Sequence, residues 1–171
     1  MTRLDVLSPL PGSTMLLADV PDPVFAQAIV GPGLAVVPAG SGSTAALEQP
    51  PSNQPPSGQP PGIVAVSPIA GTLFQIHPHA FIVLSDGGQG ILVHLGIDTV
   101  ELDGQGFDML AAQGDRLAAG DAVIRWDPAA VEAGGRSAVV PVIALDAGSL
   151  ANVTEAGQSV TAGSLLYAVG S

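Results

Sequence analysis

All three histidines of the chain fall within one short segment, at positions 77, 79 and 94. An imidazole can act as a metal ligand, as a general base or as a nucleophile. As a nucleophile, its neutral nitrogen attacks phosphorus, and the resulting phosphoimidazole stays reactive enough to pass the phosphoryl group onward. A neighbouring histidine can donate hydrogen bonds to the phosphoryl oxygens. His94 as the phosphorylated nucleophile and His79 as its stabilising neighbour fit these two tasks.

The surroundings of His94 favour a functional role. It interrupts an apolar run, between Ile91-Leu92-Val93 and Leu95-Gly96-Ile97. An imidazole among such residues must be hydrogen-bonded, and it packs no better than leucine would. A packing histidine is the alternative for a lone residue, but three histidines beside several glycines favour a site. Its possible neighbours are His77, Gly96, Asp98 and Thr99.

His77 and His79 are two residues apart, so on an extended strand they would project from the same face. Pro78 between them cannot donate to a ladder, which predicts a strand edge or a strand end. The same three histidines with Asp98 also offer enough ligands for a tetrahedral zinc site. A zinc-dependent hydrolase is therefore the alternative function. Its ligand set resembles that of lysostaphin-type peptidases, with the motif order reversed.

The elements that must position these residues are short strands. Apolar runs bounded by Gly, Pro, Asp or Ser predict an all-β fold, an antiparallel sandwich or barrel-like arrangement; they lie at 63–66, 81–84, 91–93, 122–124 and 139–145. Short helical turns are expected only at 107–113 and 128–133. Residues 8–12 resemble residues 67–71, and residues 114–120 resemble residues 157–163, so a duplicated supersecondary unit is expected.

We expect a single domain over residues 1–171. Residues 40–62 form a Pro-rich segment with repeated Pro-Pro pairs and almost no large apolar side chain. Such a segment cannot bury enough surface to offset its ordering entropy, which predicts a flexible insertion loop within that domain.

Composition excludes several classes of protein. The net charge is −11, with four arginines and no lysine, so the chain has no basic stripe to bind nucleic acid or an anionic membrane. An acidic surface suits a basic protein partner. The absence of lysine excludes a biotinyl or lipoyl carrier, and the absence of cysteine excludes disulfides and thiolate chemistry. With no signal peptide and no apolar run of membrane-spanning length, a cytoplasmic protein is expected.

Residues 88–100, GQGILVHLGIDTV, resemble the active-site signature of the glucose-type enzyme IIA of the bacterial phosphoenolpyruvate-dependent sugar phosphotransferase system. Its constrained positions, a Gly, three apolar residues, the phosphorylated His, a second Gly and a Thr among them, are all matched. Further segments resemble the family in the same order along the chain: 19–25, 29–33, 67–71, 79–81, 101–107 and 140–142.

The resemblance implies an antiparallel β-sandwich with a duplicated motif. It implies that His94 accepts a phosphoryl group from the phosphocarrier protein HPr, with His79 assisting without being phosphorylated. The acceptor would be a cysteine of enzyme IIB or of an IIBC permease, so that a sugar of the glucose or N-acetylglucosamine type is taken up and phosphorylated. No cofactor is implied. The protein is expected to be a monomer that meets the inner face of the plasma membrane through the permease.

Apolar residues near the start of the chain are candidates for the surface that docks partners, although each could equally be an ordinary core residue; they are Val24, Phe25, Ile29 and Val30. One position departs from the family. A threonine usually stands two residues before the assisting histidine, hydrogen-bonded within the site, and here that place is His77. The sequence leaves open whether His77 takes over the orienting role or is merely exposed.

Overall fold

The computed structural model describes residues 3–27, 31–38, 63–104, 106–145, 147 and 150–169. The Pro-rich segment predicted at 40–62 lies outside these residues. Strands dominate the described chain: β1 (Leu4–Leu7), β2 (Gly12–Leu16), β3 (Gly33–Pro38), β4 (Ile63–Val66), β5 (Gly71–His77), β6 (Ala80–Leu84), β7 (Gly90–His94), β8 (Phe107–Met109), β9 (Arg116–Leu117), β10 (Ala122–Trp126), β11 (Val140–Ala144), β12 (Leu150–Ala151), β13 (Ser159–Val160) and β14 (Leu165–Val169).

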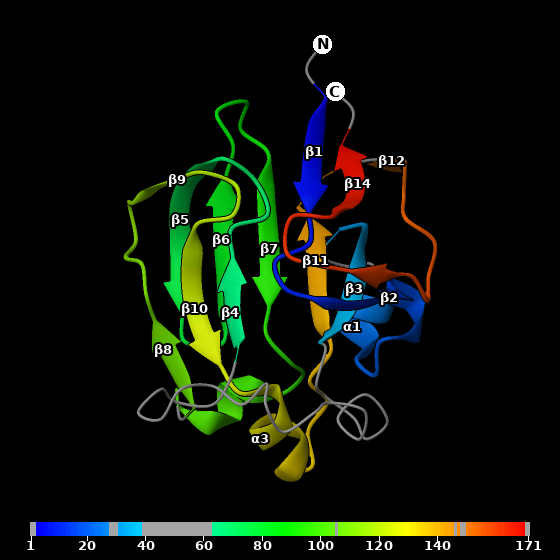
Figure 1. Cartoon of the computed structure of the whole chain (residues 1–171), viewed down its shortest axis with the longest axis vertical. Helices are drawn as coiled ribbons and strands as arrows, with labels where there is room; N and C mark the ends of the chain where they lie inside the picture. Colours follow the sequence, from blue (N-terminus) through cyan, green and yellow to red (C-terminus); the bar gives the residue numbers. More distant parts are fainter. Residues whose placement is uncertain are drawn as a thin grey trace, which may run out of the picture.

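These strands form three antiparallel sheets, so the all-β prediction is confirmed. The large sheet has the order β13-β2-β3-β11-β7-β6-β5-β9, and two smaller sheets have the orders β1-β14-β12 and β4-β10-β8. In Figure 1 the smaller sheets lie against the large one, and none of the described sheets closes into a barrel. The first and last strands, β1 and β14, pair side by side.

The predicted duplication is confirmed by matched hydrogen bonds. In the first copy of the repeat, the Ser8 hydroxyl donates to the Leu10 carbonyl over 2.6 Å, and in the second copy Ser67 donates to Ile69 over the same distance. Each copy then begins a strand with glycine, β2 at Gly12 and β5 at Gly71.

The two copies also bind each other reciprocally. The Leu7 amide donates to the Pro68 carbonyl, and the Val66 amide, 59 positions after Leu7, donates to Pro9. Residues 114–120 and 157–163 support the two copies in the same way, since the Gly120 amide donates to Ser67 and the Gly163 amide to Ser8, both over 2.9 Å. Sequence repeats thus correspond to a pseudo-symmetric pair of units.

One helical prediction is correct and the other is wrong. Helix α3 (Pro128–Ala133) begins after Asp127, whose carboxylate accepts from the amides of Ala129 and Ala130, and it has proline in its first turn. Residues 107–109 of the second predicted turn are instead strand β8, paired with β10. Pairing wins there because it stacks the Phe107 ring on the Trp126 ring, with centroids 5.9 Å apart.

Among the described residues, three further short helical segments were not predicted: η1 (Leu17–Asp19), α1 (Pro23–Ala26) and η3 (Thr99–Leu102). They are turns of three or four residues, too short to show helical periodicity in sequence. No helix in the described part of the chain has the length and apolarity that a membrane span requires.

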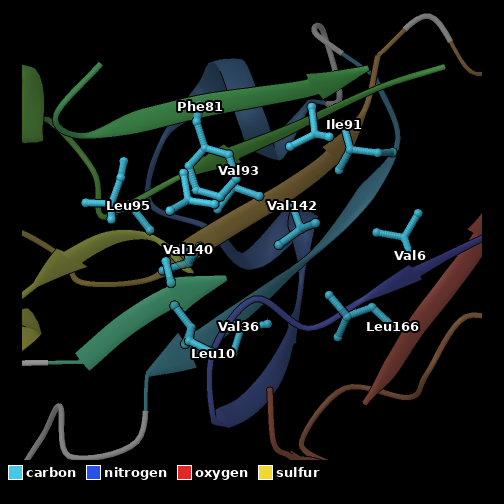
Figure 2. Packing of buried hydrophobic residues seen from close by; sticks show 14 of the residues in the cluster. Val6, Leu10, Val36, Phe81, Ile91, Val93, Leu95, Val140, Val142 and Leu166 are labelled. Atoms are coloured by element: carbon cyan, nitrogen blue, oxygen red, sulfur yellow. The ribbon is translucent and has the colours of Figure 1, made fainter. Parts of the chain in front are cut away.

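Alternation along the strands divides the apolar residues of the large sheet between its two faces. One face carries Phe81, Ile91, Val93, Val140 and Val142, which meet residues such as Leu10 and Leu166 from the other layer in the main core (Figure 2). All of these side chains are essentially removed from solvent.

The opposite face of the large sheet carries a second, smaller cluster. Ala35 of β3 and Ile143 of β11 pack there with Phe25 of α1 and with Leu17 of η1. Leu92 of β7 packs against the same cluster, so the side chain two positions further along that strand, His94, projects from this face as well.

Gly33 tests how tightly the large sheet is packed. A Cβ at this position would lie within 2.9 Å of both the Val142 carbonyl oxygen and the Ile143 Cα of β11. Because backbone atoms of a central strand cannot yield, Gly33→Ala should lower the free energy of unfolding by roughly 3 kcal/mol in urea denaturation. Gly87→Ala is the matched control, since its nearest atom is a side-chain oxygen 3.9 Å away; equal stability of the two variants would contradict the prediction.

Candidate active site

Strand register brings two of the histidines to one row of the large sheet. His94 is the last residue of β7 and lies opposite Ala80 of β6, and Ala80 lies opposite His77, the last residue of β5. Directly opposed residues share one face of a sheet, so His77 and His94 flank the small Ala80 side chain. His94 therefore ends its strand, where the sequence had suggested an interruption within one.

His79 reaches the same place from a turn. Pro78 and His79 form the two-residue connection between β5 and β6, so Pro78 stands at a strand end, as predicted, and not within a continuous strand. The Leu95 amide donates to the His79 carbonyl over 2.7 Å and ties this turn to the end of β7. The His79 ring lies 5.3 Å from the His94 ring, centroid to centroid, at an interplanar angle of 67°.

A hydrogen bond fixes the chemistry of His94. Its Nδ1 lies 2.6 Å from the carbonyl oxygen of Gly96. Because a carbonyl oxygen only accepts, Nδ1 carries the proton and donates, and the lone pair of the neutral ring is left on Nε2. The His94 side chain is only partly buried. It thus combines a fixed tautomer with access from outside, as a nucleophile requires.

The loop after His94 is held in place by its own bonds. Gly96 has φ of +82°, and a Cβ there would lie 2.7 Å from the Thr99 methyl group, so glycine is required. The buried Thr99 hydroxyl donates to the Leu95 carbonyl over 2.8 Å, and the Ile97 amide donates to Ser137 over 2.8 Å. Of the predicted neighbours, Gly96 binds His94 directly, whereas Thr99 shapes the loop.

Arg136 braces the next part of this loop. Its Nε donates to the carbonyl of Asp98 over 3.2 Å, and its Nη2 donates to the carboxylate of Glu101 over 3.0 Å. Asp98 is a non-glycine residue with φ of +61°, a conformation that persists only where the surroundings enforce it. The exposed Asp98 side chain is thereby held at the rim of the site.

Burial sets the protonation of both site histidines. It lowers the pKa of His94, while the Gly96 carbonyl and the carboxylates of Asp22 and Asp98 oppose this decrease. Burial also lowers the pKa of His79, and the neighbouring rings of His94 and His77 lower it further. Both rings are consequently neutral at physiological pH, which leaves a lone pair available for attack.

The predicted docking residues are only partly described. Phe25 of α1 is buried in the second cluster, and its ring lies 5.1 Å from the His94 ring. Val24 lies in the same helical turn, whereas Ile29 and Val30 lie outside the described residues. Phe25, which the sequence assigned to docking, therefore forms an apolar wall beside the His94 ring.

Sequence reasoning missed three residues of the site: Asp22, Gln75 and Arg136. Asp22 acts on His94 through its charge, and Arg136 lies about forty positions away in sequence. Only Gln75 carried a local signal, since it stands two residues before His77 on the same strand face.

The described residues contain no group of three or more His, Asp or Glu side chains that could hold a metal ion. His77, His79 and His94 follow one another as a series of rings, and the Nδ1 atom of His94 is engaged by a carbonyl. The zinc hydrolase alternative thus has no support in the structure.

Comparison with known proteins decides the family. Residues 4–52 and 54–150 match the family described as phosphoenolpyruvate-dependent sugar phosphotransferase system, EIIA 1. A glucose-specific EIIA component of the phosphotransferase system from Staphylococcus aureus is 33% identical over 150 residues, which cover 86% of this chain and 77% of that protein. The chain belongs to this EIIA family. It is a phosphocarrier component of the sugar phosphotransferase system, as the signature at 88–100 predicted.

Other members agree in sequence and in shape. The glucose-specific EIIA component of Staphylococcus epidermidis is 34% identical over 143 residues, covering 82% of this chain and 73% of that protein. The solved structure of the glucose permease IIA from Mycoplasma capricolum matches with a TM-score of 0.80 at 27% identity, covering 99% of this chain and 97% of that one. The described residues of this EIIA therefore have the fold of the family.

The lowered pKa of His94 predicts a pH dependence of stability. Below the ordinary histidine pKa of about 6.5, His94 is protonated in the unfolded chain but stays neutral in the folded protein, because folding lowers its pKa. Acidification therefore favours unfolding. The free energy of unfolding should fall as the pH decreases from 7 through this range, and should fall less in His94→Gln. Chemical denaturation at several pH values measures the difference, and identical slopes would show that folding leaves the pKa unchanged.

Proposed function

We propose that this EIIA protein carries the phosphoryl group on Nε2 of His94. The observation that supports this most directly is the hydrogen bond from His94 Nδ1 to the Gly96 carbonyl, since it leaves Nε2 as the nucleophilic atom of a partly accessible ring. In the proposed role, the donor is the phosphohistidine of HPr, and the acceptor is a cysteine of enzyme IIB or of an IIBC permease.

Loading exchanges one phosphorus–nitrogen bond for another. The Nε2 lone pair of His94 attacks phosphorus in line with the bond to the HPr histidine, and that bond breaks as its electron pair returns to the donor ring. The His94 ring becomes formally cationic, with its proton still on Nδ1. The Gly96 carbonyl and the nearby carboxylates of Asp22 and Asp98 stabilise this charge.

Unloading reverses the charge flow. A cysteine thiolate of the acceptor attacks phosphorus, the bond to Nε2 breaks, and its electron pair restores the neutral His94 ring. His79 stands beside the transferring group, with its ring 5.3 Å from that of His94. A hydrogen bond from a His79 nitrogen to a phosphoryl oxygen would offset the charge that accumulates there in the transition state.

The charge of the protein suits transient partners in the cytoplasm. A net charge of −11 favours fast encounter with basic surfaces, and salt screens this attraction. Such an attraction suits a carrier that must both bind and release its partners. The relatives from both Staphylococcus species are glucose-specific components. We therefore propose that the phosphoryl group is delivered, at the inner face of the membrane, to a permease for a sugar of the glucose type.

The first test is phosphorylation itself. Incubation with phosphoenolpyruvate, enzyme I and HPr should give an acid-labile, base-stable adduct on wild-type protein and none on His94→Ala. Mass spectrometry under basic conditions locates the adduct. A phosphoryl group found on Ser, Thr or Asp would remove the proposal.

The second test separates the roles of the two histidines. His79→Gln should still be phosphorylated on His94, but transfer to purified enzyme IIB should slow by on the order of a hundredfold, because a hydrogen-bond donor to the transition state is lost. Rapid-quench measurement of both half-reactions checks this. If loading slows as much as unloading, His79 acts in both half-reactions, and if neither slows, His79 has no role in transfer.

A further inference from the structure

His77 is the one histidine to which the proposed transfer gives no task. Its ring lies 5.9 Å from the His79 ring at an interplanar angle of 24°, a stacked arrangement. With His79 and His94 only 5.3 Å apart, the three imidazoles form a series with His79 in the middle.

The contacts of the His79 ring with His77 and with His94 differ in geometry, and the difference decides which parts of the His79 ring stay accessible. The His77 ring lies nearly parallel to the His79 ring, at 24°, whereas the His94 ring is tilted against it at 67°. The nitrogens of an imidazole lie at its rim and not on its faces. Stacking on His77 therefore restricts rotation of His79 while leaving its nitrogens free for a phosphoryl group.

His79 needs such a support because of where it stands in the chain. It occupies the tip of a two-residue turn, and its carbonyl, which accepts from the Leu95 amide, is the part that this bond fixes. Its side chain is only partly buried. A side chain of this kind samples several rotamers unless a neighbour selects one.

His77 is itself held on the side away from the turn. The Gln75 side-chain amide nitrogen lies 2.7 Å from His77 Nε2. Since an amide NH₂ only donates, His77 Nε2 accepts, and its ring is fixed on the sheet face that carries His94. Gln75, His77 and His79 thus support one another in turn.

We propose that His77 is a positioning residue for phosphoryl transfer: its ring face, held by Gln75, keeps His79 in the rotamer that serves His94. This inference rests on the proposed function. The sequence left open whether His77 orients its neighbour or is merely exposed. Its side chain is exposed, and in this proposal it nevertheless orients His79, by stacking and not through a hydroxyl-like hydrogen bond. The carboxylates of Asp22 and Asp98 act on His94, at the other end of the series.

The test compares His77→Ala with His77→Phe at pH 8, where ordinary histidines are neutral. His77→Ala removes the stacked ring, so transfer from phosphorylated His94 to enzyme IIB should slow roughly three- to tenfold, the effect of losing one aromatic pair. His77→Phe gives up the hydrogen bond from Gln75 but keeps a ring face at the same position at the end of β5. Because the ring face is the part that acts on His79, this variant should restore the rate to within about twofold of wild type. Phe74→Ala, an exposed ring on the same strand, is the control and should match wild type.

Three-bond NMR couplings of His79 give a second measurement that needs no partner protein. One rotamer should dominate in wild type and His77→Phe, and several should average in His77→Ala. A wild-type rate and rotamer in His77→Ala would overturn the inference, as would a His77→Phe variant as slow as His77→Ala. If wild type is not phosphorylated on His94, the proposed function fails, while the couplings still decide whether His77 positions His79.

Discussion

The site depends on one hydrogen bond, from Nδ1 of His94 to the carbonyl of Gly96. It decides which ring nitrogen holds the proton, and therefore which one can attack. The carbonyl points at the ring because Gly96 adopts a positive φ that side chains rarely adopt, and a Cβ there would lie 2.7 Å from the Thr99 methyl group. A local backbone conformation thus sets the reactive state of a side chain two residues earlier.

The rest of the structure keeps that local geometry rigid. The loop is bound to the segment before β11 through Ile97 and Ser137, and Arg136 clamps its far end at Asp98 and Glu101. Strand β7 lies between β6 and β11 in the large sheet, so its end cannot shift alone. Phosphoryl transfer gains from such rigidity because catalysis here is mostly positioning and electrostatics.

The charged groups around His94 affect its two charge states differently. In the proposed transfer, a neutral, partly buried His94 is favoured before the step, and the carboxylates of Asp22 and Asp98 become favourable partners only when the ring turns cationic. The same carboxylates would repel the phosphoryl dianion on His94. This repulsion would keep the phosphorylated form from being too stable to pass the group on. A phosphocarrier must both accept and release the phosphoryl group, so neither its free form nor its phosphorylated form should be strongly stabilised.

The sequence predicted features that depend on residues close together in the chain, and it missed those that depend on contacts between distant residues. Short alternating runs predicted the strands, and paired Ser-Pro motifs predicted a duplication that hydrogen bonds of Ser8 and Ser67 bear out. The segment at 107–113 was mispredicted because pairing with β10 and stacking on Trp126 outweigh local preference. Asp22 and Arg136 were missed because folding brings the first near His94 and the second onto the loop at Asp98 and Glu101, and no spacing rule records either.

The sequence by itself determined the family, through a signature that surrounds His94 and the glycine two residues beyond it, and it predicted the chemistry of His79 and His94. These are local facts, carried by residue type and short spacing. Only the tertiary structure decided which nitrogen of His94 is free, which wall Phe25 forms, and that His77 stacks on His79. Those outcomes depend on the register of β5, β6 and β7, and register is set by packing of the whole sheet.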